Sequence, residues 1–210
     1  MENYNQIMLI SADIYSVVKS MNNIGWNAIR ESSINRILYL SAVMYSFMEA
    51  EQKNIFSNDY SFVITIGGPE DPNISNAITN LESNEVIDRH DIGFTLGHVN
   101  LENTFKDYPL YAEKKKWIDD ILYIIGIYGE DKIYDFVFRD PQYQLSLKTN
   151  AQYTLDLTPN NATVKFLNSF KNDFEQQAKK INQNYSLNNR QYLSMYFEFV
   201  FGKILRGDLS

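Results

Sequence analysis

The chain has 210 residues, of which 44% are hydrophobic and 14% aromatic, and these fractions are typical of a folded protein. It contains no cysteine, which excludes disulfides, thiolate chemistry and cysteine-based zinc sites. The formal net charge of -7 argues against a protein that binds nucleic acid on its own, because such proteins owe much of their affinity to Lys and Arg on phosphates.

The sequence favours a cytoplasmic protein without a membrane partner. The first segment, MENYNQIMLISADIY, lacks the basic region and the long apolar run of a signal peptide. Elsewhere, charged residues interrupt the apolar segments well before they reach the length that spans a bilayer.

Two helices are expected first. Apolar residues from Ile7 to Met21 recur at helical spacing, which predicts a helix over residues 4–21 that Asn22-Asn23-Ile24-Gly25 ends. The segment INRILYLSAVMYSF, residues 34–47, is apolar on nearly every face, so we expect a helix surrounded by other elements. Ser32 or Ser33 would cap it. Arg36, near its start, is either one half of a buried ion pair or a surface residue.

A strand, a short helix and a hairpin follow. SFVITI is β-branched and aromatic and stops at Gly67-Gly68-Pro69, which indicates a strand running into a tight turn. Apolar residues within 74–81 share one face of a helix that Asn73 would cap. VIDRHDIGFTL then predicts a hairpin. Helix, strand, helix and hairpin in this order outline a winged helix.

The second half is predicted to be helical. Asp107-Tyr108-Pro109 breaks the chain, so we expect a winged-helix-like domain over residues 1–108 and a helical domain over residues 109–210. Helices are expected over 111–127, from Glu130 or Asp131 to Asp140-Pro141, over 160–181, and from Ser186 or Asn188 onward. The alternating segment LSLKTNAQYTLDLTP predicts a second small β element. The fold class is therefore mainly α, of the α+β type.

Two clusters are candidates for contact with a partner or with DNA. Arg89 and His90 lie where the tip of the predicted wing would be, a position that either reaches a DNA backbone or only keeps a turn soluble. Lys114, Lys115 and Lys116 form the one compact basic run of the sequence, in the first turns of the helix over 111–127. Such a run is either a solvated face or a contact for an acidic partner or phosphate.

The last helix is the best candidate for a protein interface. Tyr192, Tyr196 and Phe199 recur at helical spacing in its aromatic LSMYFEFVFGKIL core. Aromatic side chains anchor interfaces because they bury a large area at a low cost in conformational entropy. The other interpretation is that these residues belong to the core.

Catalytic patterns are not found. His98 has no acidic or histidine neighbour at helical spacing, and the adjacent acids of Asp119-Asp120 and Glu130-Asp131 point to different helix faces. Gly67-Gly68-Pro69 lacks the lysine and the spacing of a phosphate-binding loop. We therefore expect no enzyme, no metal and no cofactor.

Three segments together resemble the middle component of three-component ABC-ATPase defence systems: ESSINRILYLSAVMYSF, FVITIGGPEDPNISNAITNLESNEVID and IIGIYGEDKIYDFVFRDPQYQ. The resemblance extends over residues 34–143, about half of the chain. In such systems, the Lamassu type among them, a small protein accompanies an SMC/Rad50-like ATPase and an effector. The resemblance implies a non-enzymatic adaptor that binds the ATPase, meets DNA mainly through that complex and links it to an effector nuclease, with no small-molecule substrate.

Two other hypotheses remain at this point. A winged-helix DNA-binding regulator or antitoxin would need a basic face over residues 74–91, but this window has Arg89 against four acids, Glu82, Glu85, Asp88 and Asp91. Its asparagines still offer groups that read bases. A hydrolase or nuclease with an unrecognised site is the third hypothesis, and no residues can be named for it.

Overall fold

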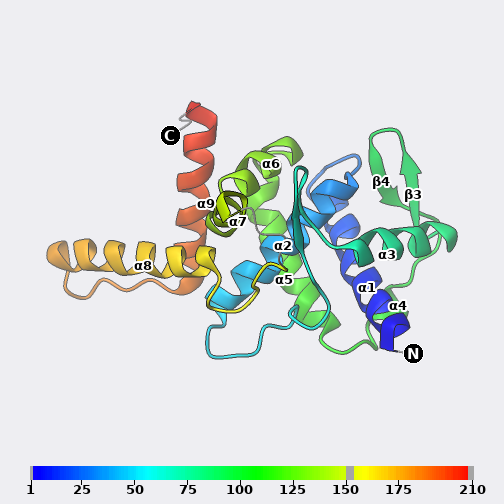
Figure 1. Ribbon diagram of the computed structural model, residues 1–210, viewed down its shortest axis with the longest axis horizontal. Helices are drawn as coiled ribbons and strands as arrows, with labels where there is room; N and C mark the ends of the chain where they lie inside the picture. The colour runs from blue at the N-terminus through cyan, green and yellow to red at the C-terminus, as the bar shows by residue number, and fades with distance from the viewer. Residues whose placement is uncertain (1, 150–153, 208–210) are drawn as a thin grey trace.

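The first two helices form the centre of the computed structural model, which describes residues 2–149 and 154–207. Helix α1 spans Glu2–Asn23 and α2 spans Glu31–Met48, close to the predicted bounds. The expected cap of α2 by Ser32 or Ser33 is wrong, because both residues lie inside the helix and its N-cap residue is Arg30, whose side chain makes no capping hydrogen bond. Every residue of α2 from Ser33 to Phe47 is buried, as predicted from a segment that is apolar on nearly every face. Figure 1 shows α2 in the middle of the molecule, with α1 and α3 on one side and α8 and α9 on the other.

Two antiparallel hairpins flank helix α3, which spans Pro72–Ser83. Strands β1 (Val63–Thr65) and β2 (Gly68–Glu70) pair around the Gly67 turn, and β3 (Ile87–His90) pairs with β4 (Gly93–Leu96) as predicted. The cap of α3 differs from the expected Asn73. The Asp71 side chain instead accepts a hydrogen bond from the Asn73 backbone N–H, and Pro72 opens the helix.

The pairing of the β3–β4 hairpin differs from the expected winged-helix outline. The SFVITI strand, β1, pairs with β2 and not with the later hairpin. The partner of that hairpin is Ile29, just before α2: the Ile29 N–H donates to the Phe94 carbonyl at 3.0 Å, and the Phe94 N–H donates to the Ile29 carbonyl at 2.8 Å. A single residue between α1 and α2 thus supplies the third strand position.

The chain after the β3–β4 hairpin is helical, with the short α4 (Glu102–Phe105) followed in the second half by α5 (Tyr111–Gly126), α6 (Glu130–Phe138), α7 (Pro141–Thr149), α8 (Ala162–Ile181) and α9 (Asn189–Arg206). The expected β element is wrong over residues 145–149, which belong to α7. Residues 150–153 of that segment lie outside the described residues, and Thr154 forms one isolated bridge to Val63. Asn188, one of the two residues predicted to cap the last helix, caps α9. Its side chain accepts a hydrogen bond from the Gln191 backbone N–H, and the Gln191 side chain accepts one from the Asn188 backbone N–H.

The two predicted domains share one hydrophobic core. It includes apolar side chains of α1 and α2 and continues without a break into α5, α6, α8 and α9. Helix α1 packs on α5, while α2 packs on α5, α6, α8 and α9. Among the described helices, none combines the length and the hydrophobicity that a membrane-spanning segment needs.

Candidate functional site

Arg89 and His90 lie on the β3–β4 hairpin, and both side chains contact neighbouring residues of the fold. The Arg89 Nε and Nη2 atoms donate to Oε1 and Oε2 of Glu82 on α3, each at 2.8 Å, and the guanidinium lies over the Phe94 ring. This bidentate hydrogen bond lowers the pKa of Glu82. His90 Nε2 lies 3.0 Å from Thr95 Oγ1 on the opposite strand. The hairpin therefore uses both predicted side chains for its own structure.

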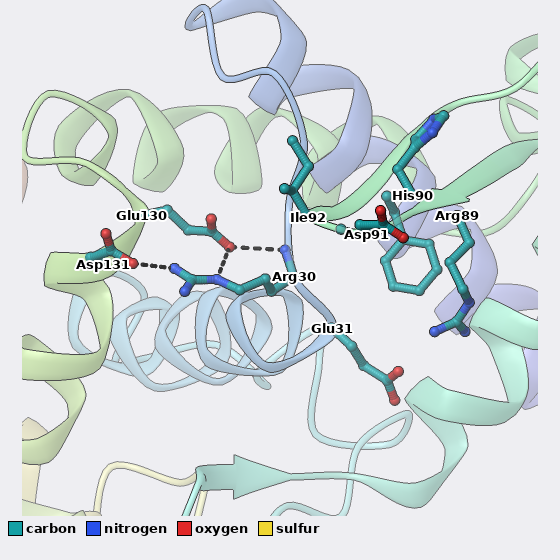
Figure 2. A pocket seen from close by; sticks show the side chains of 10 residues that line it. Arg30, Glu31, Arg89, His90, Asp91, Ile92, Glu130 and Asp131 are labelled. Carbon is teal, nitrogen blue, oxygen red and sulfur yellow. Dashed lines mark hydrogen bonds and ion pairs between the residues drawn. The ribbon is translucent and has the colours of Figure 1, made fainter.

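A polar groove lies between this hairpin and the start of α6. We call it the hairpin groove, and it is lined by Arg30, Glu31, Arg89, His90, Asp91, Ile92, Gly93, Phe94, Glu130 and Asp131. Figure 2 shows Arg30 pointing toward Glu130 and Asp131, whereas Arg89 points away from them. At the tip, Ile92 is 65% exposed.

Arg30 joins the start of α2 to the start of α6. Its Nη2 donates to Asp131 Oδ1 at 2.5 Å, its Nε lies 3.1 Å from Glu130 Oε1, and its backbone N–H donates to the same oxygen at 2.8 Å. These bonds, first to Asp131 and then to Glu130, raise the pKa of Arg30. Acids in the first turn of α6 also suit its dipole. Both arginines of the groove are thus paired with carboxylates, Arg30 with Glu130 and Asp131 and Arg89 with Glu82 on α3, which leaves them poorly placed to bind phosphate.

The predicted three-lysine cluster does not exist as an exposed surface. Lys114 is buried, and its ammonium donates to Asp13 Oδ2 at 2.8 Å and to Asp59 Oδ2 at 2.6 Å. Lys115 pairs with Asp119 one helical turn away, at 2.7 Å. Only Lys116 is fully on the surface. Three consecutive residues of a helix point about 100° apart, so a run of lysines need not form one patch.

The predicted interface aromatics divide in the same way. Tyr192 and Tyr196 are buried, so they belong to the core, the other interpretation of the pattern. Phe199 is 45% exposed and faces a groove together with Tyr134 (38%), Phe138 (44%) and Phe166 (44%). We call this the aromatic groove. It has a volume of about 650 Å³ and is lined by Tyr134, Asp135, Phe138, Arg139, Pro141, Gln144, Phe166, Tyr196, Phe199, Val200 and Lys203.

The aromatic groove is built from four helices that come together only in the fold. Helix α6 supplies Tyr134 and Phe138, α8 supplies Phe166, and α9 supplies Phe199, with α7 adding residues of its first turns. Other aromatic side chains pack against these rings: the Phe166 ring contacts Tyr196, and the Phe199 ring contacts Phe170. The groove is therefore a continuation of the aromatic core that reaches the surface.

Two buried polar groups join distant segments. The sequence left Arg36 as either half of a buried ion pair or a surface residue, and it gave no sign that Asp140 is buried. Arg36 is buried without an acidic partner: Nε and Nη2 donate to the Gly67 carbonyl at 3.2 and 2.5 Å, and the guanidinium lies over the Tyr134 ring. Asp140 is fully buried and accepts hydrogen bonds from Tyr39, from Thr163 and from a backbone N–H. The partners of both groups lie far away in the sequence, so no local pattern predicts these hydrogen bonds.

No family model, curated protein or solved structure matches the chain. The arrangement of side chains must therefore carry the argument about function. Within residues 2–149 and 154–207, no group of three histidines or acids is placed to hold a metal ion. Of the two grooves, the aromatic one gathers four exposed aromatic rings, whereas the two arginines of the hairpin groove are already paired with carboxylates.

Proposed function

We propose that the chain is a non-enzymatic adaptor subunit that binds an SMC/Rad50-like ATPase and links it to an effector nuclease in prokaryotic antiphage or antiplasmid defence. The aromatic groove carries this proposal, because four exposed aromatic side chains gather on one surface. Exposed apolar patches of this kind mark sites of protein interaction, and buried aromatic anchors dominate the energy of such interfaces. The resemblance of residues 34–143 to the middle components of these systems supplies the class of partner.

The same proposal includes a winged-helix fold for residues 1–108. The order α1, Ile29 bridge, α2, α3 and β3–β4 hairpin supports it, since Ile29 pairs with Phe94 of the hairpin as a first strand would. In this interpretation the β1–β2 hairpin is an insertion between the second and third helices of the winged helix. Winged-helix subunits that accompany SMC-type ATPases fit such a scaffold.

A DNA-binding regulator is the second candidate. One observation favours it: the exposed face of α3 carries Ser75, Asn76 and Thr79, which are side chains that can bond to base edges. Against it stands the pairing of the two arginines of the hairpin groove, because Arg89 is occupied by Glu82 and Arg30 by two acids. Phosphate contacts supply much of the affinity for DNA, so this candidate ranks second.

The test is a pull-down of the full chain, tagged and expressed from its native locus, with DNase added to the lysate. We expect a coiled-coil ATPase, identified by mass spectrometry, to be recovered at an undiminished level after DNase. Phe199→Asp should reduce this recovery strongly. Tyr123→Asp is the matched control, because Tyr123 is an aromatic residue that is 72% exposed on α5 and lies outside both grooves.

Two results would contradict the adaptor proposal. The first is recovery of the chain alone, with retention of a duplex from its own promoter, which would favour the regulator. The second is recovery of an ATPase only while DNA is intact. If both aspartate variants keep the ATPase equally well, the partner is bound elsewhere and the aromatic groove no longer carries the proposal.

A further inference from the structure

Two cationic residues, Arg139 and Lys203, line the aromatic groove, and we call them its cationic rim. Lys203 Nζ lies 4.6 Å from the centre of the Phe199 ring, and the Arg139 Nη1 donates to a carbonyl of its own helix, that of Asp135. Among the described residues, neither Lys203 nor Arg139 forms a salt bridge with a carboxylate. The groove's own acid, Asp135, lies 3.3 Å from Lys132 Nζ, so its charge is already offset.

This rim is opposite in sign to the chain as a whole, whose net charge is -7. An acidic partner would be repelled by most of the surface and attracted here, which favours one docking position over others. A second copy of the chain fits less well. In a two-fold symmetric contact across this groove, Arg139 and Lys203 would face the same cations of the other copy, with no acid of the groove free to pair with them.

The helical walls also decide the form of the occupant. All lining residues belong to α6, α7, α8 and α9, or lie between two of them, so no strand edge lines the groove for an extended peptide to pair with. A helix needs no such edge, because its backbone bonds are internal and its side chains alone enter the groove. Figure 1 shows α9 beside α6 and α7, the helices that together with α8 supply the lining residues.

We propose that the aromatic groove binds an amphipathic helix of a partner protein, whose apolar face packs on Phe138, Phe166 and Phe199 and whose carboxylates pair with Arg139 and Lys203. This inference rests on the proposed function in taking the groove as a protein-binding surface, and it adds the chemistry of the occupant. Single-stranded nucleic acid is the competing occupant, since bases stack on aromatic rings. Two cations in a chain of net charge -7 give it little to hold a phosphate backbone.

The test uses a phage-displayed library of random peptides of about 16 residues, long enough for about four helical turns. The library is selected on the immobilised full chain. We expect the enriched peptides to have apolar residues at helical spacing together with Asp or Glu, and to become helical on binding. Their affinity, measured by fluorescence anisotropy, should fall at least about tenfold for the Arg139→Glu and Lys203→Glu variants. Lys53→Glu, at an exposed lysine outside the groove, is the control and should bind as the native chain does.

Several outcomes would overturn the inference. The selection would contradict it by enriching no peptide, or by enriching basic or uncharged peptides. A double variant, Phe138→Asp with Phe199→Asp, would contradict it by binding the peptides as well as the native chain does while keeping the native circular dichroism spectrum. Displacement of the peptides by a single-stranded oligonucleotide at low concentration would also contradict it. The failure of the adaptor proposal is distinguishable. If the pull-down recovers an ATPase and Arg139→Glu and Lys203→Glu do not change its recovery, the adaptor proposal stands and the proposed acidic helix is ruled out. If acidic helical peptides bind the groove but no ATPase is recovered, the proposed acidic helix stands and the adaptor proposal fails.

Discussion

Lys114 is a lysine held inside the fold by two carboxylates. Burial alone would lower the pKa of this ammonium, but the attraction of Asp13 and Asp59 more than offsets that effect, so the pKa of Lys114 is raised. The rings of Phe56 and Tyr60 lie beside the same nitrogen, and the Tyr60 hydroxyl donates to Asp13. The cluster joins α1, α5 and the loop that precedes β1, so its role is to hold these segments together.

We expect Lys114→Met to lower the free energy of unfolding by about 3 kcal/mol, because the substitution leaves two buried carboxylates without their cation. Urea denaturation at neutral pH, followed by circular dichroism, measures the change. Lys116→Met removes a neighbouring exposed lysine of the same helix and should change stability by no more than about 0.5 kcal/mol. Similar losses for the two variants would show that Lys114 does not depend on its buried partners.

Asp140 is a buried carboxylate with hydrogen bonds but no cationic partner. Burial raises the pKa of its carboxyl, and the bonds from Thr163, the Tyr143 backbone and Tyr39 offset this only in part. Between the ordinary carboxyl pKa, about 4, and the raised value, the unfolded chain has released the proton while the native state still holds it. Native stability contributed by this group therefore falls as pH rises through that window.

Replacing Asp140 by Asn removes this ionisation, so the variant should gain stability relative to the native chain as pH increases from 4 to 7. The comparison of the two proteins at each pH isolates Asp140, because the raised pKa of Asp13 affects both equally. Thermal or urea unfolding over a series of buffers gives the difference. A difference that is constant with pH, or that changes in the opposite direction, would contradict the prediction.

At the scale of elements, local signals predict the positions of helices well, their capping residues in part, and long-range pairing poorly. Asn188 and the apolar spacing of α9 are readable in the sequence, as is the uniform hydrophobicity of α2. The segment LSLKT alternates like a strand, yet it continues a helix that Pro141 opens and whose Tyr143 N–H is capped by Asp140. Five alternating residues are too few to outweigh a helix start just before them.

The candidate site was the least predictable part. Phe199 is readable as an aromatic residue at helical spacing, but its exposure depends on α6 and α8 leaving a gap over α9. The four exposed rings of the aromatic groove come from positions 134 to 199, and no local window contains them. The pairing of Arg89 with Glu82 likewise depends on the hairpin folding back on α3. Such features require the tertiary structure.

The bridge between Ile29 and the hairpin gives a prediction at this scale. Gly93 has a φ of +140°, and a Cβ there would lie 2.5 Å from the Ile29 carbonyl oxygen, so Gly93→Ala should disrupt the bridge. We expect a loss of about 1–3 kcal/mol in the free energy of unfolding. It should be accompanied by faster amide exchange at Phe94, whose N–H donates to that carbonyl.

Gly202→Ala is the matched control, because a Cβ at Gly202 in α9 would meet no atom within 4 Å. Alanine favours the helix over glycine by up to about 1 kcal/mol, so this variant should be slightly more stable than the native chain. A Gly93→Ala variant as stable as the native chain would mean that the hairpin does not rely on Ile29.

For the whole molecule, the shared core bears on the expected boundary at residue 108. A fragment of residues 1–108 would retain α1 and α2 but lose the α5, α6, α8 and α9 surfaces that cover them. We expect this fragment to unfold without a cooperative transition and to bind a hydrophobic dye, while the full chain unfolds cooperatively. Calorimetry of both measures this, and a sharp transition for the fragment would show that the first half folds alone.

The burial of α2 also affects how the sequence can vary. A helix with one wet face offers positions where substitutions accumulate freely, but residues 33–47 have no such face, because six other elements surround them. Random substitutions should therefore destabilise the fold at each of these consecutive positions, and they should be tolerated on the outer surfaces of α8 and the two hairpins. Distant relatives would then retain the α2 segment longest, and an ancestral likeness is best sought there.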